Sequence, residues 1–235
     1  MNSTKKLLAT AVAASTMAVA AMAPVANAEV SASVGVASTY LWRGYDLGTG
    51  TPAVSGDLNF SQNGFYTGIW GSSGDTAAGT EYDLYIGYGG EVGDFSYDVS
   101  LWSYVYPTGA GYLDDEDTAE LEETNIGDLM DAVISVGYGP VALTYYGNVE
   151  GADDYSYVTL DATFDKFNVL LGSHSGDTDE ATHLNVAYSY NDNLSFTLSK
   201  IVSSNDGDID EDSGDMVEVD GDVKFVVSYS LPIGE

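Results

Sequence analysis

The stretch Thr80-Glu-Tyr-Asp-Leu-Tyr-Ile-Gly-Tyr-Gly89 decides the fold class of this 235-residue chain. Large apolar side chains fall on every second position, and the positions between them carry mostly acidic or small side chains. Alternation with a period of two residues is typical of a β-strand whose two faces meet different surroundings. The stretch therefore predicts one strand of an antiparallel sheet that is apolar on one side and polar on the other.

The same alternation recurs along the whole chain after residue 28. We predict twelve strands, at residues 30–43, 53–61, 65–72, 80–89, 95–106, 129–139, 141–147, 155–164, 167–173, 182–190, 194–203 and 221–231. Several of these runs reach the ~9–11 residues that a tilted strand needs to cross a membrane.

The connections between the predicted strands are alternately short and long. The short ones are 62–64, 90–94, 139–140, 165–166 and 191–193; the longer ones are 44–52, 73–79, 107–128, 148–154, 174–181 and 204–220. An even number of strands with tight turns on one side is typical of a bacterial outer-membrane barrel. We therefore predict an all-β fold, an antiparallel transmembrane β-barrel of about 12 strands with short periplasmic turns and long acidic extracellular loops.

The alternative is a soluble antiparallel barrel or sandwich, in which the apolar face of each strand forms the core. Aromatic residues at the ends of the runs favour the membrane version, because such residues form girdles at membrane surfaces. They are Tyr40, Trp42, Tyr82, Tyr88, Tyr138, Tyr188, Tyr190 and Tyr229.

The N-terminus predicts export through the Sec pathway. Lys5 and Lys6 precede an uncharged, mostly apolar or small-residue stretch, and Ala26-Asn-Ala28 has the form of a signal-peptide cleavage site. We expect residues 1–28 to be a signal peptide and residues 29–235 to be a single barrel domain in the outer membrane. Without residues 1–28 the chain keeps four basic residues against 37 acidic ones, a charge of about −33 that repels nucleic acid and attracts cations.

Five motifs resemble the TorF-like family of proteobacterial porins. In order they are Ser38-Thr-Tyr-Leu-Trp-Arg-Gly-Tyr45, Pro52-Ala-Val-Ser-Gly-Asp-Leu58, Gly64-Phe-Tyr-Thr-Gly-Ile-Trp-Gly-Ser72, Thr80-Glu-Tyr-Asp-Leu-Tyr-Ile-Gly-Tyr88 and Asp94-Phe-Ser-Tyr-Asp-Val99. The resemblance implies an outer-membrane β-barrel and brings no particular substrate with it. One departure is the C-terminus, Leu231-Pro-Ile-Gly-Glu235, because outer-membrane barrels usually end in an aromatic residue.

Charged residues on the polar faces of the strands are the candidates for lining a lumen. They are Arg43, Asp57, Glu81, Asp83, Asp98, Asp131, Asp161 and Lys224. We expect Arg43 to form an ion pair inside the barrel, with Asp57 on the neighbouring strand as its partner.

Two of the long loops are strongly acidic. Weak binding of Ca²⁺ or Mg²⁺ is an open alternative to a purely solvated loop, although the spacing in the second loop does not fit an EF-hand. The candidate ligands are Asp114, Asp115, Asp117, Asp206, Asp208, Asp210 and Asp212. We expect no other cofactor.

The sequence favours a porin or channel for small solutes or cations. The alternatives are a non-conducting structural or adhesive barrel and a barrel hydrolase using His174 or His183. We do not expect an enzyme, because no nucleophile motif such as G-x-S-x-G is present. The expected partners are outer-membrane lipid and lipopolysaccharide, the barrel-assembly machinery and small solutes or cations, but not nucleic acid.

Overall fold

The computed structural model describes residues 28–108, 113–114, 121–122, 124–152, 155–176, 180–204 and 221–233. Within these residues, no helix is long and apolar enough to cross a membrane. The predicted signal peptide lies outside them, apart from Ala28.

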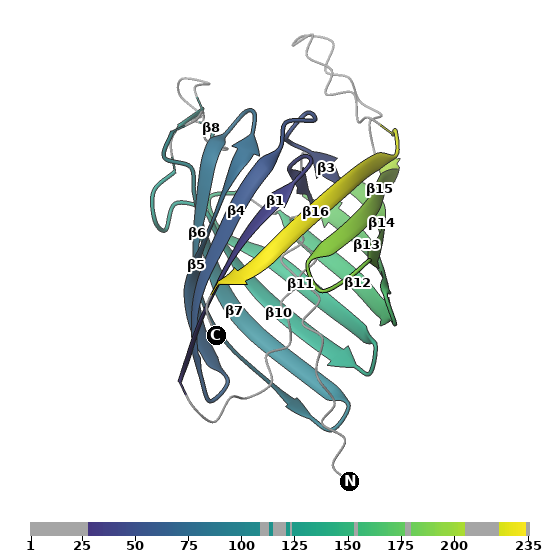
Figure 1. The fold of residues 1–235 in the computed structure, drawn as a ribbon. Helices are drawn as coiled ribbons and strands as arrows, with labels where there is room; N and C mark the ends of the chain where they lie inside the picture. Colours follow the sequence, from purple (N-terminus) through teal and green to yellow (C-terminus); the bar gives the residue numbers. More distant parts are fainter. Residues whose placement is uncertain are drawn as a thin grey trace.

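Twelve antiparallel strands form one closed barrel, tilted steeply against the barrel axis (Figure 1). The predicted all-β fold with a closed antiparallel barrel of twelve strands is confirmed. In chain order the wall consists of β1 (Glu29–Ala37), β4 (Ala53–Gln62), β5 (Phe65–Asp75), β6 (Gly79–Val92), β7 (Phe95–Val105), β10 (Met130–Tyr138), β11 (Val141–Glu150), β12 (Ser156–Phe164), β13 (Phe167–Ser175), β14 (Ala181–Ser189), β15 (Leu194–Ser204) and β16 (Lys224–Ile233).

Strand β1 closes the barrel because it pairs on both sides. Val34 lies opposite Gly56 of β4 and opposite Leu231 of β16. Each wall strand thus has a neighbour on either side, so no wall strand is left as an unpaired edge. Two short hairpins lie outside the wall: β2 (Leu41–Trp42) with β3 (Tyr45–Asp46), and β8 (Leu113–Asp114) with β9 (Leu121–Glu122).

The apolar face of the strands is the outer surface of the barrel. Leu58, Ile69, Ile86 and Val99, on four successive strands, are 41–55% exposed. The inner face carries mostly Ser, Thr, Gly, Asn, Asp and Tyr side chains, of which Asp83, Asp98 and others are buried. The apolar faces of the strands therefore do not form the core of the barrel, which is what the alternative of a soluble barrel or sandwich required.

The tight turns lie where the sequence predicts them, although β6 runs on to Val92 and leaves only 93–94 of the predicted turn 90–94. Asn63 and Gly64 adopt φ angles of 53° and 85°, the pair of positive values that a two-residue hairpin turn requires. The predicted strands 65–72, 141–147 and 167–173 are each longer in the structure. Between β5 and β6 only residues 76–78 remain outside the strands, so the predicted longer loop 73–79 is mostly strand.

The prediction for the first strand is wrong beyond residue 37. The wall strand β1 ends at Ala37, and the residues predicted to continue it up to Arg43 turn away from the wall. Tyr40 is only 5% exposed, whereas the alternation had placed it, with Trp42, on the outer face. The connection between β1 and β4 is thus residues 38–52, longer than the predicted 44–52.

Candidate functional site

Most of residues 38–52 folds into the interior of the barrel, while 49–52 are exposed, and we call residues 38–52 the plug segment. Ser38 N donates a 2.9 Å hydrogen bond to Val227 O on β16, where the segment leaves the wall. Leu41, 3% exposed, packs against Val226 of β16. Figure 1 shows β3 near the rim of the longer connections. Thr76 N, in the turn between β5 and β6, donates to Leu47 O at 3.1 Å and holds the far end of the segment.

The tip of the plug segment is a two-residue hairpin turn. Trp42 pairs with Tyr45, and the turn residues Arg43 and Gly44 have φ angles of 44° and 95°. Two successive positive φ angles are typical of the turn that matches the twist of a tight hairpin. The hairpin therefore carries the Arg43 side chain at its tip.

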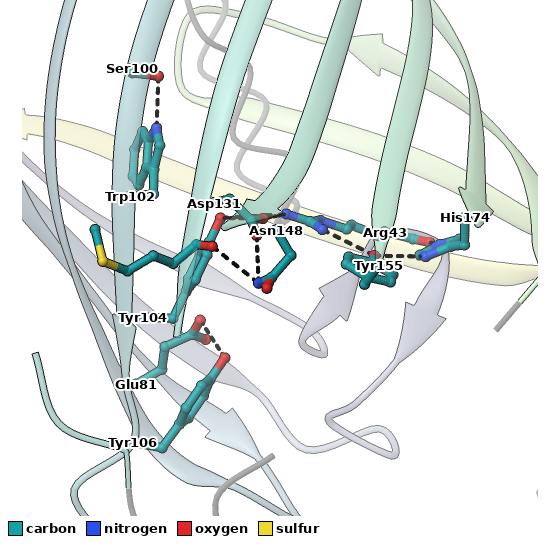
Figure 2. A network of polar contacts seen from close by, with 11 residues as sticks. Arg43, Glu81, Ser100, Trp102, Tyr104, Tyr106, Asp131, Asn148, Tyr155 and His174 are labelled. Carbon is teal, nitrogen blue, oxygen red and sulfur yellow. Dashed lines mark hydrogen bonds and ion pairs between the residues drawn. The ribbon is translucent and has the colours of Figure 1, made fainter. Parts of the chain in front are cut away.

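The guanidinium group of Arg43 contacts two strands of the wall and the residue before a third. Nη2 lies 2.9 Å from Asp131 Oδ2 on β10 and 3.4 Å from the Tyr104 hydroxyl on β7, while Nη1 donates to the Tyr155 hydroxyl at 3.0 Å. Figure 2 shows these side chains converging from different sides. Arg43 is 6% exposed, so this ion pair is buried.

Aromatic rings surround the same guanidinium group. Its Cζ lies 4.8 Å from the ring centroids of Trp42 and Tyr146, 4.9 Å from that of Tyr157 and 5.6 Å from that of Tyr155. These distances are within the range of cation–π attraction, which strengthens when water is excluded. The tyrosines belong to a cluster of buried apolar and aromatic residues on the inner wall. The charge of Arg43 is thus held by rings as well as by hydrogen bonds.

The two histidines hold the hairpin turn from the other side. His174 Nε2 donates to the carbonyl oxygen of Arg43 at 2.8 Å, and its Nδ1 accepts from the Tyr155 hydroxyl at 2.9 Å. A Cβ atom at Gly44 would lie 2.5 Å from Cγ of His183. The main chain therefore approaches the wall at a distance that only glycine permits.

The acidic residues nearest the plug segment differ in the number of hydrogen-bond and ion-pair partners that their carboxylates have. Glu81 accepts hydrogen bonds from the hydroxyls of Tyr40, in the plug segment, and Tyr106, the latter at 2.8 Å. Asp131 accepts hydrogen bonds from the Arg43 guanidinium, the Tyr104 hydroxyl and the Asn148 amide. Asp83, fully buried, accepts no hydrogen bond from any described residue at either oxygen.

The interior nearer the tight turns contains separate acid–tyrosine contacts. The Tyr85 hydroxyl donates to Asp57 at 2.8 Å, and the Tyr66 hydroxyl donates to Asp98 at 2.8 Å. Asp161 accepts from the Asn168 amide at 2.6 Å. Each of these three carboxylates has at least one protein partner and, among the described residues, no basic neighbour within ion-pair distance.

The candidate lumen residues all lie at inward-facing positions of the wall, except Arg43, which reaches the interior from the plug segment. Lys224, partly exposed, begins β16 opposite Ser199. The expected pairing of Arg43 with Asp57 is wrong. Arg43 pairs with Asp131 instead, because the chain turns inward after Ala37 and carries the guanidinium across the interior to β10.

The candidate metal ligands lie outside what the structure describes. Asp115, Asp117, Asp206, Asp208, Asp210 and Asp212 are beyond the described residues, and for Asp114 the structure describes the backbone alone. Among the described residues no group of three or more His, Cys, Asp or Glu side chains is arranged to hold a metal ion.

Sequence reasoning missed most partners of Arg43. Tyr104, Tyr155 and His174 come from distant parts of the chain, and nothing in their spacing connects them with Arg43. One signal was available: the Arg43-Gly44 pair between two aromatic residues resembles a tight hairpin turn more than the middle of a strand.

The model of a bacterial family of unknown function, Gcw_chp, matches residues 21–220. No curated protein shows a significant match to the chain.

Proposed function

Since the chain belongs to the Gcw_chp family of bacterial proteins of unknown function, we propose a function from its own structure: an outer-membrane barrel that forms a channel for small cations, closed at rest by the plug segment. The closed barrel of twelve strands fits an outer-membrane protein. The resemblance of five sequence motifs to TorF-like porins supports the assignment to outer-membrane barrels.

The outer surface supports a location in a membrane. A belt of exposed Leu, Ile, Val and Phe side chains surrounds the barrel, and soluble monomers rarely expose continuous apolar patches of this kind. In a bilayer the same belt faces lipid, and the closed ladder of hydrogen bonds leaves no unpaired strand edge in the hydrocarbon. The predicted signal peptide supports Sec export to that membrane.

The observation that carries the channel proposal is the acidic, polar interior closed by one inserted basic hairpin. Asp57, Asp98 and Asp161 present carboxylates toward the lumen, and rings of acidic side chains favour cations in pores. Arg43 places a positive charge inside the barrel, where it opposes cation entry. Displacing the hairpin removes both the obstruction and the opposing charge.

A non-conducting barrel is the second candidate, and the buried Arg43–Asp131 pair favours it, because a permanently held plug leaves no path. We propose no enzymatic role. Both ring nitrogens of His174 and of His183 are occupied by hydrogen bonds, and none of these bonds involves a serine.

Conductance in planar bilayers tests the proposal. We expect rare, small openings for the wild-type protein and a several-fold larger or more frequent current for Arg43→Ala. Lys166→Gln is the control, because it removes one positive charge at an exposed tight turn. Gel mobility with and without boiling shows that each variant is folded. The absence of current from both the wild type and a folded Arg43→Ala variant would contradict the channel proposal and favour the non-conducting barrel.

A further inference from the structure

The two histidines of the sequence, His174 on β13 and His183 on β14, both lie against the hairpin turn of the plug segment. Their side chains are buried, at 3% and 0% exposure. Histidine is the side chain that ordinarily changes its charge between pH 5 and 8. The side chains that ordinarily titrate in this range are therefore concentrated where the hairpin meets the wall.

The contacts of His174 fit a neutral ring (Figure 2). Its Nε2 lies 2.8 Å from the carbonyl oxygen of Arg43, so this nitrogen carries a hydrogen. Its Nδ1 lies 2.9 Å from the Tyr155 hydroxyl, whose oxygen already accepts a hydrogen bond from Nη1 of Arg43. A proton on Nδ1 would therefore bring a second N–H donor against a hydroxyl group that now donates to the ring.

The groups that face His174 do not offset a positive charge on it. The rings packed around it are Trp42 and Tyr45 of the hairpin, Tyr155 and Tyr157 at the start of β12, and His183 of β14. Arg43 and His183 act on it electrostatically, and both are basic. The carboxylate of Asp131 is already in contact with Arg43. A charged His174 would thus add a second buried cation beside one carboxylate.

His183 is arranged in the same way, but its hydrogen bonds go to the wall. Its Nδ1 donates to the side-chain oxygen of Asn185 at 3.1 Å, and its Nε2 accepts from the Tyr157 hydroxyl at 2.7 Å. Its titratable neighbours are Tyr157 and His174. It meets the hairpin only through the close approach of Gly44. We therefore assign the response to His174, which is hydrogen-bonded to the turn itself.

We propose that protonation of His174 in mildly acidic solution releases the hairpin of the plug segment from the wall. Release separates the ring from Arg43 and admits water, so the charged ring is accommodated in the released state and not in the closed one. The released state therefore binds a proton that the closed state excludes. Its population rises as the pH falls below about 6.5, where free histidine titrates. The inference rests on the proposed function, because it treats the plug segment as the part that closes the channel.

A cysteine in place of Leu41 measures release without any current. The sequence contains no cysteine, and Leu41 is 3% exposed where the plug segment packs against β16. Leu41→Cys protein in micelles is treated at pH 7.5 and pH 5 with an aromatic disulfide reagent, and each rate is divided by that of a free thiol at the same pH. We expect protection at pH 7.5 and a relative rate up to roughly 30-fold higher at pH 5, the factor expected for one excluded proton.

His174→Gln, on the same Leu41→Cys background, is the decisive variant. The glutamine amide still offers an N–H donor to the carbonyl oxygen of Arg43, but it does not titrate. We expect it to keep the protection at pH 7.5 and to abolish the increase at pH 5. His183→Gln should keep that increase, because His174 remains. Gel mobility without boiling, after exposure to pH 5, shows that the barrel itself has not unfolded.

Hydrogen exchange of the chain without the cysteine gives a second readout. The backbone amides of residues 38–48, corrected for the intrinsic effect of pH on exchange, should exchange faster at pH 5 in the wild type and not in His174→Gln. Equal corrected rates at both pH values in the wild type would overturn the proposal. So would an acid response that persists in folded His174→Gln, because it would assign release to His183 or to the carboxylates.

Conductance separates this proposal from the channel. Release of the plug segment at pH 5 without any current, together with a silent Arg43→Ala variant, would contradict the channel and support the acid response. Current through Arg43→Ala, with the plug segment of the wild type protected at both pH values, would support the channel and contradict the acid response.

Discussion

Arg43 Nη2 and Asp131 Oδ2 lie 2.9 Å apart although 88 positions separate the two residues in the chain. The first is at the tip of an inserted hairpin and the second is on the inner face of β10 (Figure 2). Their side chains are 6% and 4% exposed, so the pair is hidden from bulk water. This contact joins the plug segment to the wall of the barrel opposite its point of entry, and it makes the position of the plug segment testable.

Removing one partner of this pair should destabilise the barrel. We expect Arg43→Gln to lower the free energy of unfolding by about 3 kcal/mol, because it leaves the buried Asp131 carboxylate without its cation. The double variant Arg43→Gln with Asp131→Asn should recover part of that loss. Urea unfolding into and out of lipid vesicles measures both, with Lys166→Gln as the control. Strictly additive effects would contradict a direct interaction.

A side chain at Gly44 should expel the hairpin from the lumen. Gly44→Val places atoms into His183 and strains a backbone with φ of 95°, so Arg43 should become accessible. Arg43 is the only arginine in the sequence, and an arginine-specific protease therefore reports on this one position. We expect cleavage after residue 43 in the variant and protection in the wild type.

Gly50→Val is the matched control for that experiment. Gly50 also has a positive φ, 78°, but a Cβ there meets nothing within 4 Å. The control thus carries the backbone strain without the collision. Equal cleavage of both variants would mean that strain, not contact with His183, loosens the segment.

The barrel was predictable from sequence because the signals that specify its strands and turns lie within a few residues of one another. The alternation of apolar and polar residues indicates which face of the strand each side chain occupies, and Asn63-Gly64 indicates where one hairpin turns. Both signals lie within a few residues, and the structure follows them in twelve strands.

The plug segment was not predictable in the same way. Ser38 to Arg43 continues the alternation of β1 exactly as a longer strand would, so the pattern gave no reason to end the strand at Ala37. What bends the chain inward is a set of contacts with β7, β10 and β13 that form only in the closed barrel. The partners of Arg43 therefore follow from the fold and not from the sequence around Arg43.

The exposed apolar belt leads to a prediction about location. Fractionation of cells should place the mature chain in the outer membrane, and the protein should migrate faster on gels when it is not boiled. The physical reason is that the closed, fully paired wall resists detergent and stays compact until heated. Recovery as a soluble periplasmic monomer would contradict the membrane assignment.

The two largest connections should face the outside of the cell. Epitope tags inserted within 107–128 or 204–220 should be labelled on intact cells, because long loops of such barrels are extracellular. A tag inserted at 165–166, a tight turn at the opposite end, should be labelled only after the outer membrane is broken. The reverse pattern would invert the topology.

If the barrel conducts, its permeation should favour cations at low ionic strength. Reversal potentials across a KCl gradient, measured on the more open Arg43→Ala variant, should show cation preference in dilute salt. The preference should weaken near 1 M, where the Debye length falls from ~10 Å at 0.1 M to ~3 Å. Neutralising the acidic residues of 114–123 should reduce it as well, since they surround the loop-side entrance in the predicted topology. Asp165→Asn, which neutralises one acidic residue at a tight turn, is the control for each single neutralisation within 114–123. An anion-selective or salt-independent reversal potential would show that acidic side chains do not govern permeation.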